Sequence, residues 1–224
     1  MDIIAGASRA RYLEQFDPLK RNKVIVLSRS GAPYQTVGHM IENYIFTHPL
    51  PKDQKSYVCI IAGLCDLTEK KEGGHRTYQE IIYTKTPEAT QDQIRTKISN
   101  LNNKVISLGA MPVFCTITPS HLKTWNLHRR DIGATSHLLY EHKYDQMQVD
   151  LHKAVHLAND IVIERNEHNH VHTPHLHCHF EHRKSKGKKY FQYKNMTDGC
   201  HPNMTIKEGW ALSLGVTIEK NRNS

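Results

Sequence analysis

Three residues that cooperate in nucleophilic catalysis occur at opposite ends of this sequence. Ser8 follows a short apolar run, residues 3–5, and Gly6 allows the sharp turn with which a buried parallel strand leaves a sheet. Near the other end, Asp198 and His201 lie three residues apart, before a C-terminal helix. A carboxylate at this spacing can orient the imidazole, whose second ring nitrogen can then take a proton from a hydroxyl. The pattern predicts a nucleophile, a base and an orienting acid.

Ser8 also has a purely structural interpretation. A serine between a strand and a helix is a good N-cap, and residues 9–14 are expected to form a helix. The two interpretations differ in what the hydroxyl contacts, either a backbone N–H or the ring of His201. The Asp–His pair near the C-terminus favours the nucleophile, because Ser8 is the only serine expected beside the first strand at this sheet edge.

Two further loops are expected at the same edge of the sheet. Gly31 follows a second strand candidate, residues 23–27, and is either a turn residue or an unobstructed backbone donor to an anion. Cys65 follows the strongest strand candidate, residues 57–62. Open parallel sheets carry their chemistry at the carboxyl ends of their strands, so we expect these loops to lie beside Ser8.

The elements that must position these residues alternate between strand and helix. Apolar runs predict strands at 3–5, 23–27, 57–62 and 112–117, with a last core strand at 175–180 and a short edge strand at 78–84. Helical spacing of apolar residues predicts helices near 37–45, 86–108, 139–165 and 205–218, and loops are expected at 69–74 and 121–136. This order predicts a single α/β domain over residues 1–224. Its expected architecture is a three-layer α/β/α, flavodoxin-like, doubly wound parallel sheet of about five strands.

Composition limits the cellular setting. The chain has 224 residues and a mean hydropathy of -0.61, and no apolar run approaches the roughly 18 residues of a membrane span. It shows no basic-then-apolar leader, and its five cysteines are an odd number without framework spacing. We therefore expect reduced thiols, no membrane contact and an intracellular location, cytoplasmic or nuclear.

The net charge of +8 is compatible with an anionic partner or simply with a soluble basic surface. Arginines 129 and 130 and a lysine-rich loop are the candidate contacts. The loop is the predicted basic patch, formed by Lys184, Lys186, Lys188 and Lys189. They predict weak, sequence-independent binding of nucleic acid through phosphate contacts.

Histidines are concentrated between residues 168 and 182. On a strand, His175, His177 and His179 would share one face and could bind zinc with Cys178 or another imidazole. The alternative is a polar edge strand without metal, and this is what we expect, so the sequence predicts no metal and no cofactor. His152 and His156 lie four apart on a predicted helix and are expected to form a solvated face.

Four blocks, in order and over nearly the full length, resemble the SGNH (GDSL-type) hydrolase superfamily. They are Gly6-Ala7-Ser8, Gly31, Gly63-Leu64-Cys65-Asp66 and Asp198-Gly199-Cys200-His201. The resemblance implies a triad of Ser8, His201 and Asp198. It also implies an oxyanion hole formed by the N–H groups of Ser8 and Gly31, with Cys65 where the family has an asparagine. In its basic surface and its lack of a leader, the chain also looks like the accessory SGNH domains of eukaryotic retroelements.

Two departures from the family pattern concern activity. Ala7 replaces the aspartate of the nucleophile block, and Cys65 replaces the asparagine that donates to the oxyanion. A thiol is a poor donor, and loss of one oxyanion donor lowers the rate by about 100- to 1,000-fold. The resemblance implies a hydrolase of small, acetyl-like esters. The alternative is a weak or inactive fold that binds nucleic acid or a partner of a mobile element.

Overall fold

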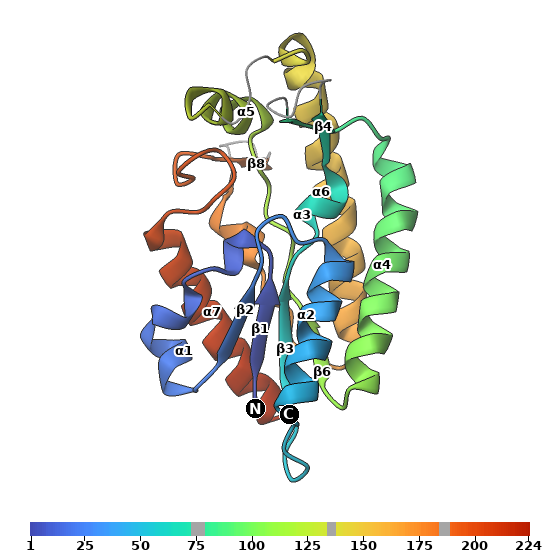
Figure 1. The fold of residues 1–224 in the computed structure, drawn as a ribbon, viewed down its shortest axis with the longest axis vertical. Helices are drawn as coiled ribbons and strands as arrows, with labels where there is room; N and C mark the ends of the chain where they lie inside the picture. The colour runs from blue at the N-terminus through green and yellow to red at the C-terminus, as the bar shows by residue number, and fades with distance from the viewer. Residues whose placement is uncertain (73–78, 134–137, 184–188) are drawn as a thin grey trace.

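Four short parallel strands form the centre of the computed structural model, which describes residues 1–72, 79–133, 138–183 and 189–224. The strands are β1 (Ile3–Gly6), β2 (Ile25–Ser28), β3 (Tyr57–Ile61) and β6 (Met111–Phe114). They are ordered β2-β1-β3-β6, and every neighbouring pair is parallel. All four carboxyl ends therefore meet at one edge, and Figure 1 shows the chain leaving β1 and β3 toward this edge.

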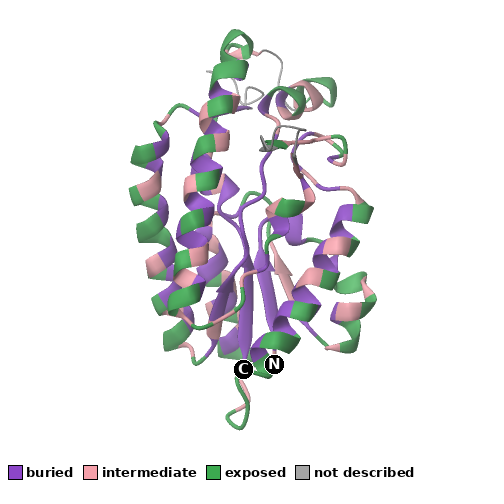
Figure 2. Ribbon diagram, turned by 180° about the vertical axis from the view of Figure 1, so that it is seen from behind, coloured by how far each residue is buried: buried purple, intermediate pink, exposed green. Residues whose placement is uncertain are grey.

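Side chains of the central strands alternate between two hydrophobic cores. In β1, Ile3 and Ala5 belong to one core, while Ile4 points to the other face together with Cys59 of β3. A strand directs successive side chains to opposite faces, so a sheet covered on both sides needs apolar residues at every position. This requirement explains the uninterrupted apolar runs of the sequence. In Figure 2 the central strands are largely buried, whereas the edge strand β2 is of intermediate exposure.

Helices cover both faces of the sheet and confirm the three-layer α/β/α architecture. One face carries α2 (Tyr34–Thr47), α4 (Pro87–Ser107) and α6 (Tyr144–His168), with α4 packed between the other two. The opposite face carries α7 (Met204–Arg222) and the short α1 (Asp17–Arg21), which contact each other. The outward sides of these helices are largely exposed in Figure 2.

Two helix starts are defined by side-chain caps. The hydroxyl of Thr86 accepts the backbone N–H of Ala89 at 3.2 Å, at the start of α4. At the start of α7, Asn203 Oδ1 accepts the N–H of Ile206 at 3.0 Å.

The sequence predicted a parallel sheet of about five strands, but among the described residues the central sheet has four. The segment expected to be the last core strand forms a 3-10 helix, η4 (Leu176–His179). Its backbone bonds run three residues apart, from Cys178 N–H to the carbonyl of His175 and from Phe180 N–H to the carbonyl of His177. Leu176 and Phe180 are both buried, as a strand would also have placed them, but Cys178 between them is exposed. On a strand all three side chains would share the buried face, so the exposure of Cys178 distinguishes the helical turn from the predicted strand.

Several connections also differ from the predictions. Residues 9–14 form two 3-10 turns in place of a helix, η1 (Ser8–Ala10) and η2 (Leu13–Gln15). The predicted loop at 121–136 contains α5 (Leu122–Asp131). The predicted edge strand, β5 (Gln79–Ile82), pairs with β4 (Glu69–Glu72) in a separate hairpin. The remaining elements are α3 (Leu64–Leu67), η3 (Glu141–Lys143) and the hairpin of β7 (Glu181–Arg183) with β8 (Lys189–Phe191).

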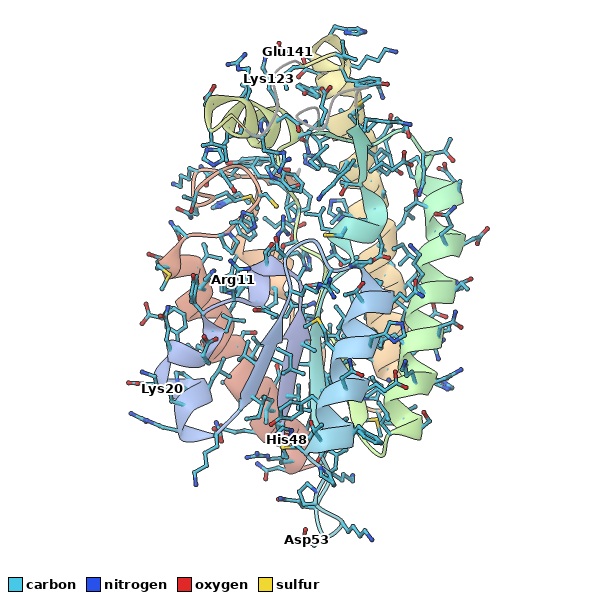
Figure 3. The ribbon with its side chains drawn as sticks, in the orientation of Figure 1. Arg11, Lys20, His48, Asp53, Lys123 and Glu141 are labelled. Atoms are coloured by element: carbon cyan, nitrogen blue, oxygen red, sulfur yellow. The ribbon has the colours of Figure 1, made fainter. Side chains whose placement is uncertain are left out.

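Charged side chains project around the outside of the molecule. Figure 3 shows Lys123 and Glu141 at the end that carries α5, and Asp53 at the opposite end, near the chain termini. Lys123 Nζ lies 4.0 Å from a carboxylate oxygen of Glu141. Among the described residues, no helix combines the length and the apolar character needed to cross a membrane.

Candidate active site

Ser8 lies directly beyond β1, in a sharp turn where the backbone passes close to β3. A Cβ at Gly6 would collide with the carbonyl oxygen of Ile61 on β3, so glycine is required where the strand leaves the sheet. Ser8 is the first residue of η1, and no side chain caps that turn. Its Oγ lies instead 2.8 Å from Nε2 of His201. The N-cap interpretation of Ser8 is therefore wrong.

Asp198 holds His201 in one orientation. One carboxylate oxygen accepts the backbone N–H groups of Cys200 and His201, at 2.9 and 2.7 Å. The other lies 2.6 Å from Nδ1 of His201. An ionised carboxylate can only accept, so Nδ1 carries the ring proton and Nε2 of the neutral ring presents its lone pair to Ser8.

The same hydrogen bonds keep Asp198 ionised. Burial by itself would raise the pKa of this carboxyl group. Hydrogen bonds from the ring and backbone of His201, and from the backbone of Cys200, outweigh burial and hold the pKa well below its ordinary value. The carboxylate therefore stays negative near neutral pH and can stabilise a positive charge that develops on His201.

Two other predicted site residues, Gly31 and Cys65, line one cavity together with Ser8 and His201. Gly31 adopts a φ of +69° in the loop after β2, a conformation that favours glycine, and a Cβ there would have open space around it. Cys65 lies in α3, just beyond β3. Burial raises the pKa of the Cys65 thiol, so it is a neutral thiol near pH 7 and only a weak hydrogen-bond donor.

The cavity has a volume of about 370 Å³ and opens onto Ser8 and His201. This size lies at the lower end of the range for small-molecule sites, which is about 300–1,000 Å³. Sequence reasoning missed several of the residues in its wall. These are Arg9, Ser30, Thr68, Lys70, Ile81, Thr116, Ile117, Thr118 and Trp125.

Arg9 joins three segments of the site. It is almost fully buried and donates Nη1 to the carbonyl of Thr118, at 2.6 Å, and to the hydroxyl of the same residue. Its Nη2 donates to the carbonyl of Pro119 at 3.0 Å and to Sγ of Cys200 at 3.6 Å. The nucleophile turn, the segment after β6 and the loop of His201 are thereby connected. The sequence offered only one signal for this role, an arginine directly after Ser8.

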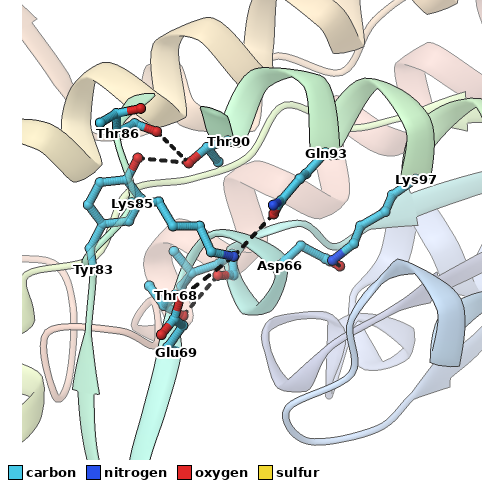
Figure 4. A network of polar contacts seen from close by, with 10 residues as sticks. Asp66, Thr68, Glu69, Tyr83, Lys85, Thr86, Thr90, Gln93 and Lys97 are labelled. Atoms are coloured by element: carbon cyan, nitrogen blue, oxygen red, sulfur yellow. Dashed lines mark hydrogen bonds and ion pairs between the residues drawn. The ribbon is translucent and has the colours of Figure 1, made fainter. Parts of the chain in front are cut away.

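Asp66 holds α3, the short helix that carries Cys65, in place. Its carboxylate accepts the backbone N–H of Tyr34, at the start of α2, and the ammonium of Lys97 on α4, each at 2.9 Å. Figure 4 shows Lys97 directed at Asp66, beside a second group in which Lys85 reaches Glu69. Asp66 is buried and thus ties α3 to two helices behind the cavity.

The loop of His201 packs against α5, which forms where the sequence predicted a loop. The backbone N–H of His121, the N-cap residue of α5, donates to the carbonyl of Gly199 at 2.7 Å. Trp125 and Arg129 of α5 contribute to the cavity wall. The helix thus supports the loop and closes one side of the site.

The side chains of the predicted basic patch lie outside the part of the chain that the structure describes, so the patch stays a prediction of the sequence. Lys184, Lys186 and Lys188 lie outside the described residues, and for Lys189 only the backbone, in β8, is described. Arg129 lines the cavity, whereas Arg130 lies 3.3 Å from Asp131.

The histidine pair of α6 also differs from the prediction of a solvated face. His156 is exposed, but the ring of His152 is half-buried, with Nε2 in contact with the hydroxyl of Tyr193 and 2.7 Å from Nε2 of Gln148. Burial lowers the pKa of His152 to about 4. This ring is a neutral packing residue near pH 7.

Comparison with solved structures identifies the fold. A GDSL-like lipase from Bacteroides thetaiotaomicron aligns with a TM-score of 0.61 and 12% identity, covering 99% of this chain and 87% of the lipase. A lipase/acylhydrolase from Enterococcus faecalis aligns at 0.57 and 10% identity, covering 98% and 95%. The acetyl xylan esterase AlAXEase aligns at 0.54 and 12% identity, covering 97% and 98%. No protein-family model and no curated protein sequence matches the chain.

Identities this low show a shared fold and leave the chemistry to the site itself. The chain has the α/β fold of SGNH (GDSL-type) lipases and acylhydrolases over nearly its full length. These matches give no support to the narrower resemblance to retroelement domains, which stays a prediction of the sequence.

Proposed function

We propose that this chain is a serine ester hydrolase of the SGNH (GDSL) type that acts on small, acetyl-like esters. The observation that carries the proposal is the hydrogen-bonded chain from Ser8 Oγ through His201 to Asp198, which opens into a cavity. The fold shared with GDSL lipases and an acetyl xylan esterase supports the same conclusion.

The first half of the reaction transfers the acyl group to Ser8. Nε2 of His201 takes the proton from Ser8 Oγ as the oxygen attacks the ester carbonyl carbon. The ring becomes positively charged, and the ionised Asp198 stabilises it. His201 then returns the proton to the alcohol oxygen as the C–O bond breaks, which leaves an acyl group on Ser8.

The second half repeats these steps with water. His201 takes a proton from water, whose oxygen attacks the acyl carbon, and the same proton returns to Ser8 as the carboxylic acid leaves. In both halves the oxyanion is held by the backbone N–H groups of Ser8 and Gly31, with Cys65 nearby. The described wall of the cavity includes Arg9, Lys70 and Arg129 and no aspartate or glutamate, so its potential favours a negative intermediate.

Hydrolysis of p-nitrophenyl acetate tests this function. We expect Ser8→Ala and His201→Ala each to abolish the enzymatic rate, because each removes a reacting group. Ser107→Ala and His48→Ala are matched controls at exposed positions and should keep the wild-type rate. Equal rates in wild type and in both site variants would contradict the proposal.

A fluorophosphonate probe gives a second reading that does not depend on the ester chosen. It should label the wild type at Ser8 and leave Ser8→Ala unlabelled, since only an activated serine attacks the phosphorus. The competing class is a binding module of the same fold, in which the weak donor at Cys65 reflects lost catalysis. That class predicts no labelling and no Ser8-dependent hydrolysis.

A further inference from the structure

A second group of reactive side chains lies at η4 and the start of β7. His177, Cys178 and Glu181 each place one possible ligand atom within 4.8 Å of the other two. They supply an imidazole nitrogen, a thiol sulfur and a carboxylate oxygen. This combination is typical of zinc sites, in which three protein ligands leave a fourth position for water.

Contacts with Thr116 orient the ring of His177. The hydroxyl of Thr116 lies 3.3 Å from the carbonyl oxygen of Pro174 and accepts the backbone N–H of His177 at 3.2 Å. It also lies 2.9 Å from Nδ1 of the ring. With Nδ1 held by this hydroxyl, Nε2 is the ring nitrogen on the side of Cys178 and the one that can ligate a metal there.

The spacing of the two stronger ligands fits a tetrahedral ion. Nε2 of His177 lies 3.7 Å from Sγ of Cys178. Zinc bonds of about 2.0–2.1 Å to nitrogen and 2.3 Å to sulfur, at a tetrahedral angle, place these atoms roughly 3.6 Å apart. A cation bound between these two atoms would replace the thiol proton.

We propose that His177, Cys178 and Glu181 bind one Zn²⁺ ion, with water as the fourth ligand. Binding converts the Cys178 thiol to a thiolate and releases one proton to solvent, so the affinity rises with pH. The ion would connect η4 to β7. Through Thr116, which also lines the cavity, it would support one wall of the candidate active site.

This trio differs from the residues that a strand would have grouped. In the 3-10 helix, the ring of His179 lies against α7, where a Cβ at Gly209 would come within 2.8 Å of it. His175 is exposed, and its ring centre lies 6.0 Å from that of His177. The sequence predicted no metal on the strand geometry, and the helical turn changes which ligands meet.

Cobalt titration and zinc analysis of the purified chain test the site. We expect one tightly held zinc per chain, and a thiolate-to-cobalt charge-transfer band when Co²⁺ is added to the chelated protein. Free zinc at about 100 times Kd should raise the melting temperature by roughly 5 to 10 °C. Cys178→Ser should remove the band, and Glu181→Gln should weaken zinc binding by at least 10-fold.

Matched controls separate this site from the other histidines and thiols. His175→Gln and Cys65→Ser should keep the band, the stoichiometry and the thermal shift, and far-UV circular dichroism checks that every variant is folded. A band of unchanged intensity in Cys178→Ser, or a wild type that neither retains zinc nor gains stability from it, would overturn the proposal. None of these measurements depends on ester hydrolysis, so they test the zinc site separately from the proposed function.

Discussion

Cys65 is the residue at which the candidate site departs furthest from an efficient esterase. It lines the cavity beside Ser8 and His201, and burial raises the pKa of its thiol. A neutral thiol donates a weak hydrogen bond, whereas an amide at the same place donates a strong one. In the proposed mechanism, the developing oxyanion therefore relies on backbone N–H groups.

Replacing Cys65 by asparagine should raise esterase activity. A new donor contacts the oxyanion more strongly than the ground-state carbonyl, so Cys65→Asn should raise kcat by about 10-fold or more with little change in KM. Steady-state kinetics on p-nitrophenyl acetate measure both constants. Cys65→Ala is the control for simple loss of the thiol, and an unchanged or lower kcat in Cys65→Asn would contradict the role assigned to this position.

In the proposed mechanism, Asp198 acts on catalysis only through His201. Asp198→Asn keeps the shape of the side chain but can donate to Nδ1, which favours the wrong tautomer for accepting the Ser8 proton. We expect kcat to fall by roughly 10³- to 10⁴-fold. Asp160→Asn, on the exposed side of α6, should have no effect. A fall of less than 10-fold would show that Asp198 does not orient the base.

The lowered pKa of Asp198 also predicts how stability depends on pH. Its folded pKa lies below the value in the unfolded chain, which is about 4. The stabilisation from the ionised carboxylate is therefore complete above about pH 4 and is lost as the pH falls toward the folded pKa. Urea unfolding should show the stability difference between wild type and Asp198→Asn narrowing below pH 4, and a constant difference would contradict this.

At the scale of secondary-structure elements, the site depends on how the helices hold the strand-end loops. Asp66 in α3 accepts hydrogen bonds from the start of α2 and from Lys97 on α4. Arg9 makes the corresponding connection between η1 and the segment after β6. Both are buried charged groups whose partners come from distant parts of the chain.

Removing the Asp66 carboxylate should destabilise the fold. Asp66→Ala leaves the buried N–H of Tyr34 without its acceptor, and the free energy of unfolding should fall by about 1–3 kcal/mol. Urea denaturation measures this change. The exposed Asp92→Ala, on α4, should change stability by less than about 0.5 kcal/mol. An equal effect of both substitutions would show that the Asp66 contacts contribute little.

At the scale of the whole molecule, the net charge of +8 carries a prediction that does not depend on the residues of the candidate active site. It predicts weak, sequence-independent affinity for nucleic acid, in which log affinity falls linearly with log salt. Replacing the four lysines of the basic patch should flatten that slope by about three to four units, since each neutralised phosphate contact contributes roughly 0.7–0.9. The variant carries Gln at Lys184, Lys186, Lys188 and Lys189.

Gel-shift titrations at several salt concentrations measure the slope, on single- and double-stranded probes. A second variant with Gln at Lys20, Lys55 and Lys220, far from the candidate patch in sequence, controls for the loss of charge alone. No retardation of either probe at low salt would leave the positive charge as a contribution to solubility.

The sequence by itself determined the layered α/β fold and the position of the Ser–His–Asp group. Parallel strands buried on both faces require continuous apolar runs, so β1, β3 and β6 could be predicted from local composition. Glycine and serine at strand ends meet at one sheet edge in any fold of this type. Ser8, Gly31, Cys65 and His201 could therefore be placed together without knowledge of their contacts.

Only the tertiary structure decided the remaining contacts. Alternating histidines fit a strand, yet residues 176–179 form a 3-10 helix in the folded chain, and this brings Cys178 and Glu181 to His177. Arg9 reaches Cys200, 191 positions later in the chain. Such contacts depend on how distant elements pack and on which buried groups must find partners, and local residue spacing carries no information about either.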